Sequence, residues 1–225
     1  MKKSLLFLLV CVSWTVAGYA QEMSETRNRN VRDDGFARWQ YRLQGGYVRR
    51  IARISDQVAP GTQDYLKKMK SGYTFGGDIH YFVSEPLGFG VKYTHNGYQY
   101  TEADFKDKIR MNYFALSGLN RLILRSEDEV LLGVNVGYQS YRDQLAASGA
   151  ELAITGGTLG AGVEIGYAFR LSPGTKAFLN LSLLSGTITK VNVETGGRKE
   201  TVKLDKDEFE GLGRLELTLG LRFGK

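Results

Sequence analysis

The chain has 225 residues, among them 28 glycines, 13 tyrosines and 11 phenylalanines but only 3 prolines. That length suits one domain of ordinary size, and the excess of glycine and tyrosine favours β-strands over helices. The formal net charge of +6 is mild and the basic residues are interspersed with acids, so the composition does not indicate a nucleic-acid partner.

The first residues predict a secretory signal peptide. Lys2 and Lys3 precede an apolar run that continues to about Val16, and Gly18-Tyr19-Ala20 places small residues where a signal peptidase requires them. We therefore expect cleavage before Gln21. The run is too short to be a spanning helix, and no other run of about 18 apolar residues follows it.

The only cysteine, Cys11, lies inside this leader. After cleavage the chain is expected to have no disulfide and no thiolate site. A lipoprotein signal ending at Cys11 is an alternative, although Val10 is an unfavourable residue before a lipidated cysteine. Residues 21–36 are polar and predict a flexible lead-in.

Eight segments after residue 37 alternate apolar and polar residues with a period of two, which is typical of β-strands with two unlike faces. The last segment is the clearest, because every odd position from Leu215 to Phe223 is apolar. The alternation blurs from Phe114 onward, where a β-bulge would shift the phase, so the faces of 114–124 stay unassigned. The strands are predicted at 38–52, 72–83, 87–95, 108–124, 130–141, 154–170, 176–189 and 211–223.

The connections between these strands alternate between long and short. Short turns are predicted at 84–86, 125–128 and 172–174, and longer polar segments at 55–71, 96–107, 142–152 and 190–208, with one helical turn possible at 64–68. Outer-membrane barrels have short periplasmic turns and longer extracellular loops, and an even strand count places both termini in the periplasm. A soluble sandwich or lipocalin-like barrel is the alternative, and it has no reason to sort its loops in this way.

Aromatic residues on the apolar faces form two groups, as expected at two membrane interfaces. One group lies near the short turns and the other near the long loops. The group near the short turns consists of Trp39, Tyr81, Phe89, Phe169 and Phe223. The group near the long loops consists of Tyr47, Tyr73, Tyr93, Tyr113 and Tyr138. The pattern therefore predicts an all-β protein, an eight-stranded antiparallel transmembrane β-barrel over residues 37–225, preceded by a signal peptide (1–20) and a periplasmic lead-in (21–36).

The polar faces of the strands would line the barrel interior. Eight strands leave room for side chains and little else, so a wide porin channel is excluded and a paired network of charges is expected. Since the last strand would close on the first, Glu216 with Arg42 is the favoured pair. The interior network is predicted to contain Arg42, Asp78, His80, Lys92, Arg110, Glu164, Arg214, Glu216 and Arg222.

The cleavage site at Ala20-Gln21, the eight alternating strands and the closing segment Leu217–Phe223 resemble those of small outer-membrane β-barrel proteins. The architecture is similar to that of outer-membrane proteins A and X. The sequence is similar to the Bacteroidetes-type outer membrane protein beta-barrel domain, which includes PorT-like proteins. The resemblance implies an integral protein of the Gram-negative outer membrane whose partners are membrane lipid, lipopolysaccharide and the barrel-assembly machinery.

Catalytic and metal sites are not expected. The chain has two histidines, and His80 is predicted to lie beside Asp78 on one inward face, with no serine recognisably placed near it. A zinc site needs three protein ligands, which two scattered histidines do not supply. No cofactor is expected either.

The segment from Thr187 to Leu204 has threonine and valine on both sides of Gly196-Gly197, which predicts a hairpin that continues beyond the membrane. An exposed edge there could pair with another protein at the extracellular loops. The expected function is that of a structural or binding barrel with a filled interior. The alternatives are an accessory subunit of a PorT-like secretion system, a narrow channel and a lipid-modifying membrane enzyme.

Overall fold

The computed structural model describes residues 36–51, 69–102, 105–124, 127–147, 150–196, 198–204 and 210–224. The expected signal peptide, nearly all of the lead-in and the helical turn at 64–68 lie outside these ranges. The strands all belong to one compact unit, Ala37–Lys225. Within the described ranges, no helix has the length and apolar character needed to cross a membrane.

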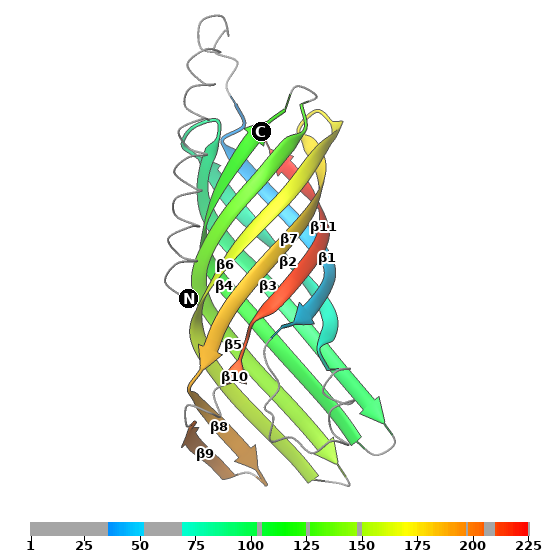
Figure 1. Cartoon of the computed structure of the whole chain (residues 1–225), viewed down its shortest axis with the longest axis vertical. Helices are drawn as coiled ribbons and strands as arrows, with labels where there is room; N and C mark the ends of the chain where they lie inside the picture. The colour runs from blue at the N-terminus through cyan, green and yellow to red at the C-terminus, as the bar shows by residue number, and fades with distance from the viewer. Residues whose placement is uncertain are drawn as a thin grey trace, which may run out of the picture. The chain divides into compact units, whose positions relative to one another are not determined.

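Eleven strands occur in the described part of the chain, and eight of them form the barrel wall (Figure 1). The eight wall strands are β1 (Trp39–Arg50), β2 (Ser71–Phe82), β3 (Leu87–Glu102), β4 (Phe105–Ile123), β5 (Glu129–Ala147), β6 (Ala150–Ser172), β7 (Thr175–Ile188) and β11 (Arg214–Gly224). The three short ones are β8 (Lys190–Thr195), β9 (Arg198–Lys203) and β10 (Glu210–Gly211).

The wall closes on itself because β11 pairs with β1. This ladder runs from Gln40 opposite Gly224 to Arg50 opposite Arg214, and every neighbouring pair in the ring is antiparallel. Closure leaves no wall strand with an unpaired edge, as a membrane-spanning sheet requires. The predicted eight-stranded antiparallel barrel, including closure by the last strand, is confirmed.

The two ends of the barrel differ. Three tight turns join β2 to β3, β4 to β5 and β6 to β7 at one end, where the start of β1 and the end of β11 also lie; we call it the short-turn end, and the opposite one the long-loop end (Figure 1). The strands β3 to β6 have 16, 19, 19 and 23 residues. A tilted strand needs only about 9–11 residues to span a membrane, so these strands extend well beyond a bilayer at the long-loop end.

Two predicted loops are therefore wrong. The segments 96–107 and 142–152 are mostly strand, since β3 continues to Glu102, β5 continues to Ala147 and β6 begins at Ala150. The cause is that many of their polar residues, such as Gln99, Lys106 and Arg142, lie on the outer face of an extended sheet, while the inner face is largely apolar.

The predicted hairpin around Gly196 is present as β8 and β9. Val191 lies opposite Val202, and Gly196 adopts a φ of 57° that suits the turn between the strands. Strand β8 also pairs with the first part of β6, from Leu152 opposite Thr195 to Gly156 opposite Val191, so the hairpin widens the sheet beyond the barrel wall.

The faces of β4 differ from the prediction. Ile109, Met111 and Tyr113 point inward and are buried, whereas Arg110 and Phe114 point outward. The ladders on both sides of β4 run without a register shift, so no bulge is present. Placing Tyr113 in an aromatic ring and Arg110 in the interior was therefore wrong.

The reason is a reversal of environment along one strand. Within the apolar band, lipid-facing residues are apolar and inward ones are polar. Beyond the band the outer face meets water and the inner face forms an apolar core. The alternation of apolar and polar residues continues there, but the apolar residues now point inward and the polar residues outward. Ile109 and Met111 lie in this outer part of β4, so their apolar side chains point inward.

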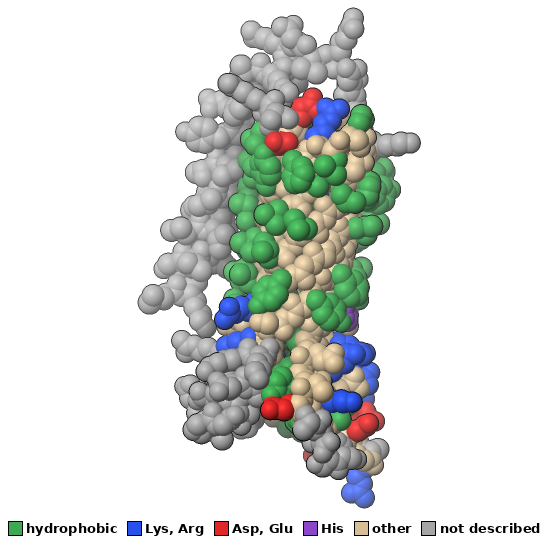
Figure 2. Space-filling view, turned by 90° about the vertical axis from the view of Figure 1, so that its right-hand side faces the viewer, with side chains coloured by type: hydrophobic (Ala, Val, Ile, Leu, Met, Phe, Trp, Pro, Cys, Tyr) green, Lys and Arg blue, Asp and Glu red, His purple; other side chains and the backbone are tan. Residues whose placement is uncertain are grey.

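A band of exposed apolar side chains surrounds the barrel, and Figure 2 shows it on one side. Leu116 is 66% exposed and Leu159 75%, and similar side chains occur on all eight wall strands. Monomeric soluble proteins rarely expose a continuous apolar surface of this extent, so the band is a surface for contact with lipid.

Candidate functional site: the barrel interior and its long-loop end

A group of charged side chains fills the middle of the barrel. Arg42 on β1 donates from Nε to Asp78 Oδ1 at 2.7 Å and from Nη2 to Glu164 Oε1 at 2.6 Å. Lys92 forms an ion pair with the other oxygen of Glu164. All four side chains are fully buried. Buried charges are stable only when paired and hydrogen-bonded, and this cluster meets that condition with strands β1, β2, β3 and β6.

The predicted pair of Arg42 with Glu216 is wrong. Glu216 instead accepts hydrogen bonds from Arg214 Nε at 2.9 Å and from Asn96 Nδ2 at 3.0 Å. In the ladder between β1 and β11, Arg42 lies opposite Arg222, not opposite Glu216. The two arginines avoid each other by reaching acids on other strands.

Arg222 forms an ion pair with Glu129, which also accepts a hydrogen bond from Lys176 Nζ at 2.7 Å. This second group lies near the short-turn end, where β5 and β7 begin. Arg121 stacks over the Phe82 ring, with its guanidinium carbon 4.3 Å from the ring centroid. Together these side chains close the short-turn end of the interior.

A third group lies on the long-loop side of the central cluster. Arg214 Nη1 donates to Gln139 Oε1 at 2.5 Å, and the guanidinium lies over the Tyr113 ring, 5.9 Å from its centroid. Tyr113 donates to Asn135 Oδ1 at 2.9 Å. Polar groups from β4, β5 and β11 thus fill the interior at this level.

Asp78, His80 and Ser117 form a chain with some features of a catalytic triad. His80 Nε2 is 3.0 Å from Ser117 Oγ, and His80 Nδ1 is 3.0 Å from Asp78 Oδ1. Three observations do not fit a triad. The contact with Asp78 is not aligned with the ring N–H, Asp78 Oδ1 is already bound by Arg42, and the side chains lie inside the filled barrel. The arrangement is better described as part of the interior packing.

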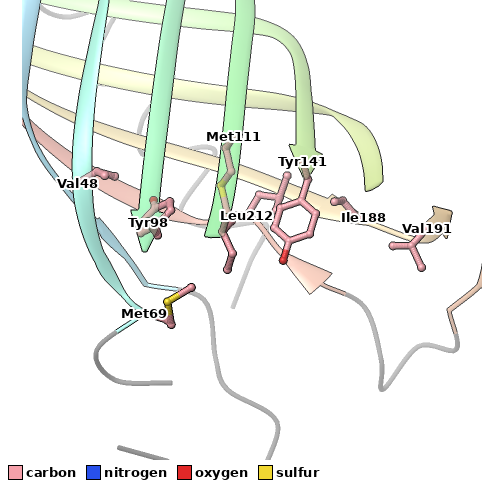
Figure 3. Packing of buried hydrophobic residues seen from close by; sticks show 9 residues of the cluster. Val48, Met69, Tyr98, Met111, Tyr141, Ile188, Val191 and Leu212 are labelled. Carbon is pink, nitrogen blue, oxygen red and sulfur yellow. The ribbon is translucent and has the colours of Figure 1, made fainter. Parts of the chain in front are cut away.

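Apolar side chains close the interior at the long-loop end (Figure 3). The cluster combines inward residues of the wall strands with residues of the segments that follow or precede them. Its members are Val48, Met69, Tyr98, Ile109, Met111, Tyr141, Ile188, Val191 and Leu212, with Tyr100, Ile154, Val193 and Leu204 packed against them. An apolar layer of this kind would exclude water and ions from the polar groups below it.

Two carboxyl groups lie close together in this outer part. Asp107 on β4 and Asp143 on β5 are diagonal neighbours in the ladder, and Tyr141 donates to Asp143 Oδ2 at 3.1 Å. Burial, together with the hydrogen bond and charge of Asp143, raises the pKa of the Asp107 carboxyl to about 8. Burial and the neighbouring carboxylate therefore favour the protonated form of Asp107 more than that of an ordinary aspartate.

The interior contains eight of the nine residues predicted for it, and Arg110 is the exception. The eight buried residues are Arg42, Asp78, His80, Lys92, Glu164, Arg214, Glu216 and Arg222. Of the ten aromatic residues proposed for the two interfaces, Tyr113 lies inside, Tyr81 is partly exposed and packs edge-on against Trp39, and the other eight are exposed. Among the described residues, no group of three histidine, cysteine, aspartate or glutamate side chains is arranged to hold a metal ion.

Some interior residues were missed. Ser117 and Arg121 lie in the stretch of β4 whose faces could not be assigned, and Glu129 lies between the predicted turn at 125–128 and the predicted strand at 130–141. A signal was available for β4: Phe114 and Leu116 form an outward apolar pair, which fixes the phase of the whole strand. Glu129 had no comparable signal, because its role depends on cations from β7 and β11.

A closed eight-stranded sheet with an apolar outer band and a charged, filled interior defines the class of small membrane-spanning β-barrels. The fold comparisons agree with this class, since the chain has the fold of solved outer-membrane barrels. No protein-family model matches the sequence. No curated protein matches it either.

Three of the similar structures illustrate the likeness. A major outer membrane protein from Thermus thermophilus superimposes with a TM-score of 0.57 at 13% identity, covering 83% of this chain and 99% of that one. Neisserial surface protein A gives 0.53 at 15% identity, covering 83% and 97%. Ail, the attachment invasion locus protein of Yersinia pestis, gives 0.53 at 15% identity, covering 83% and 99%. At such identities the likeness concerns the fold.

Proposed function

We propose that this protein is an integral outer-membrane barrel that conducts no solutes and binds partners through its long-loop end. The observation that carries this proposal is the filled interior. Three charged or polar groups occupy it in succession, and the apolar cluster around Met111 covers them. In this proposal the short-turn end and both termini face the periplasm, because outer-membrane barrels have their longer connections outside.

The outer part of the molecule supports a binding role. Strands β3 to β6 and the β8–β9 hairpin extend beyond the apolar band, which a purely structural wall would not need. A similar barrel, Ail, has been solved in complex with the heparin analogue sucrose octasulfate, so a barrel of this fold can bind a ligand. Expected partners are outer-membrane lipid, lipopolysaccharide and the barrel-assembly machinery. We propose no enzymatic activity, since the Asp78–His80–Ser117 chain is buried.

Conductance of the purified protein in planar lipid bilayers tests the closed interior. We expect no steady openings from the wild-type barrel. A variant with Arg42, Lys92 and Glu164 all changed to serine should not conduct either, because the group around Glu129 and the apolar cluster around Met111 still close the two ends. Steady openings of the wild-type protein would overturn the proposal and favour a narrow channel.

A role as an accessory subunit of a secretion system, like PorT-like proteins, is the second candidate. It is favoured by β9, whose six residues are all exposed and which, among the described strands, pairs only with β8. Such an edge can accept a strand from another protein. A photo-cross-linker at Val202 should then capture a secretion component, while the same cross-linker at Leu159 in the lipid band should not. Equal capture from both positions would count against this candidate.

A further inference from the structure

Basic side chains gather on the outer surface just beyond the apolar band, toward the long-loop end (Figure 2). Lys106, Lys108 and Arg110 follow one another on the outward face of β4, and Arg142 is the outward residue of β5 beside them. Arg142 and Lys106 are exposed, and Arg110 and Lys108 are partly exposed. We call these four residues the outer basic patch.

Two members of the patch face each other directly. Arg110 and Arg142 are opposite residues in the ladder between β4 and β5. Opposite side chains on one face of a sheet start about 5 Å apart, and like charges in that position destabilise the pair. A sheet that places two arginines there loses stability unless an anion lies between them.

Within the described ranges, no carboxylate lies beside the two arginines in their row of the sheet. In the same cross-strand row, the neighbours of the two arginines are Gly97 on β3 and Thr155 on β6. No carboxylate within the described ranges forms an ion pair with any residue of the outer basic patch. In the rows further outward, Glu151 on β6 is separated from Lys106 by one intervening strand, and Glu194 on β8 is separated from Lys108 by two. These separations are about 10 Å and 14 Å at the usual strand spacing.

The height of the patch matches that of lipid head groups. Arg142 lies four positions after Tyr138, one of the aromatic residues at the membrane interface. Arg110 lies four positions before the lipid-facing Phe114. At roughly 3.3 Å per residue and a tilt of about 40°, this places both guanidinium groups about 10 Å beyond the apolar band. The arginine side chains are long enough to reach back toward the interface.

A polar row lies between the band and the arginines. Asn112 Oδ1 accepts a hydrogen bond from Tyr93 at 3.0 Å and lies 2.7 Å from His95 Nδ1, and Asn112 Nδ2 donates to Ser140 Oγ at 3.3 Å. Apolar, polar and basic residues thus follow one another along β4 and β5. This order matches the order of acyl chains, sugar and phosphate in a glycolipid leaflet.

We propose that the outer basic patch binds the phosphate groups of a phosphorylated glycolipid in the outer leaflet, a lipid of the lipid A type. The planar fork of arginine binds phosphate through two hydrogen bonds, and a phosphate between Arg110 and Arg142 would cancel their repulsion. The acyl chains of the same lipid would lie against Phe114, Leu116 and Tyr138 below. This inference rests on the proposed outer-membrane location with the long-loop end outside.

Native mass spectrometry of the full, refolded barrel in detergent tests the inference. The probes are bisphosphorylated lipid A and the same lipid with its phosphates removed. The test variant is Arg110→Gln/Arg142→Gln. The control is Arg198→Gln/Lys199→Gln, which removes two exposed positive charges from the β8–β9 hairpin away from the band. Heat-modifiable gel migration shows that each variant is folded.

We expect the wild-type and control proteins to bind phosphorylated lipid A within about 3-fold of each other. The test variant should bind about 30-fold more weakly, since each of the two basic residues near a charged membrane surface contributes about fivefold. Removing the phosphates should weaken wild-type binding at least tenfold. Equal affinity for the two lipids, or an equal loss in the control variant, would overturn the inference. A failure of the proposed function would appear separately, as conductance of the wild-type barrel.

Discussion

Glu164 is the residue through which the filled interior can be tested most directly. Its two oxygens hold Arg42 and Lys92, and all three side chains are fully buried. Glu164→Gln keeps the shape of the side chain but removes its charge. Arg42 keeps Asp78 as a partner, whereas Lys92 loses its ion pair with an acid.

Removing one partner of a buried ion pair costs about 3–5 kcal/mol, because a charge is left without compensation in a medium that solvates it poorly. We expect a loss of that size in the free energy of unfolding of Glu164→Gln. The measurement is reversible urea unfolding in detergent micelles, with the free energy extrapolated to zero denaturant.

Glu127→Gln is the matched control. Glu127 forms an ion pair with Arg170 near the short-turn end, but the side chains are 63% and 44% exposed, so we expect a loss of about 0–1 kcal/mol. Lys92→Met in the Glu164→Gln background should recover part of the stability, because it removes the uncompensated charge. If Glu164→Gln costs no more than Glu127→Gln, the interior is hydrated and the reasoning from a dry, paired network is refuted.

Two further predictions concern the outer part and the wall. The pKa of Asp107 is raised in the folded barrel, so its stabilising contribution is complete below about pH 4 and is lost as the pH rises through 8. After allowance for solvent screening, the free energy of unfolding should therefore be about 1–2 kcal/mol lower at pH 9 than at pH 5. Asp107→Asn should remove most of that difference. A difference of the same size in the variant would contradict this prediction. Gly90→Ala should destabilise the wall by about 1–3 kcal/mol, because a Cβ there would lie 1.9 Å from the backbone oxygen of Ile79, while Gly45→Ala, with 3.7 Å to its nearest neighbour, should be tolerated. Equal unfolding midpoints for the two glycine variants would argue against the close backbone approach.

Apart from the stretch of β4 at 114–124, the parts of the fold inside the apolar band were predictable from the sequence. There the strands have one lipid face and one interior face, so a period of two fixes both strand position and orientation. β11 is an example: its odd-numbered residues from Leu215 to Phe223 point outward, and Arg214, Glu216 and Arg222 point inward. Closure followed because a membrane-spanning sheet cannot keep an open edge.

The outer part of the strands was not predictable in the same way. Beyond the band the apolar residues move to the inner face, so Ile109 and Met111 carried the pattern of a lipid-facing segment while they lie in the interior. The same change made the ends of β3 and β5 look like polar loops. The sequence alone does not mark the residue at which the environment changes.

The pairs that side chains form inside the barrel cannot be predicted from the period of two alone. Which inward side chains meet across the lumen is decided by the stagger of all eight strands. Arg42 on β1 reaches Glu164 on β6, which is not a neighbouring strand in the ring, and this contact could not be derived from strand neighbours. Ser117 was missed beside His80 because its strand had no assigned phase.

The ladder between β1 and β11 also bears on chain order. Since Gln40 lies opposite Gly224, the first and last wall strands are paired like any other two neighbouring strands. The closed ring itself therefore has no first strand; only the order of the chain defines one. A circular permutant could join the two ends near Gly224 and open instead at the Ser84–Pro86 turn, and it would keep every strand pair of the wall. The wall is thus defined by its ring of strand pairs and not by which strand comes first in the chain.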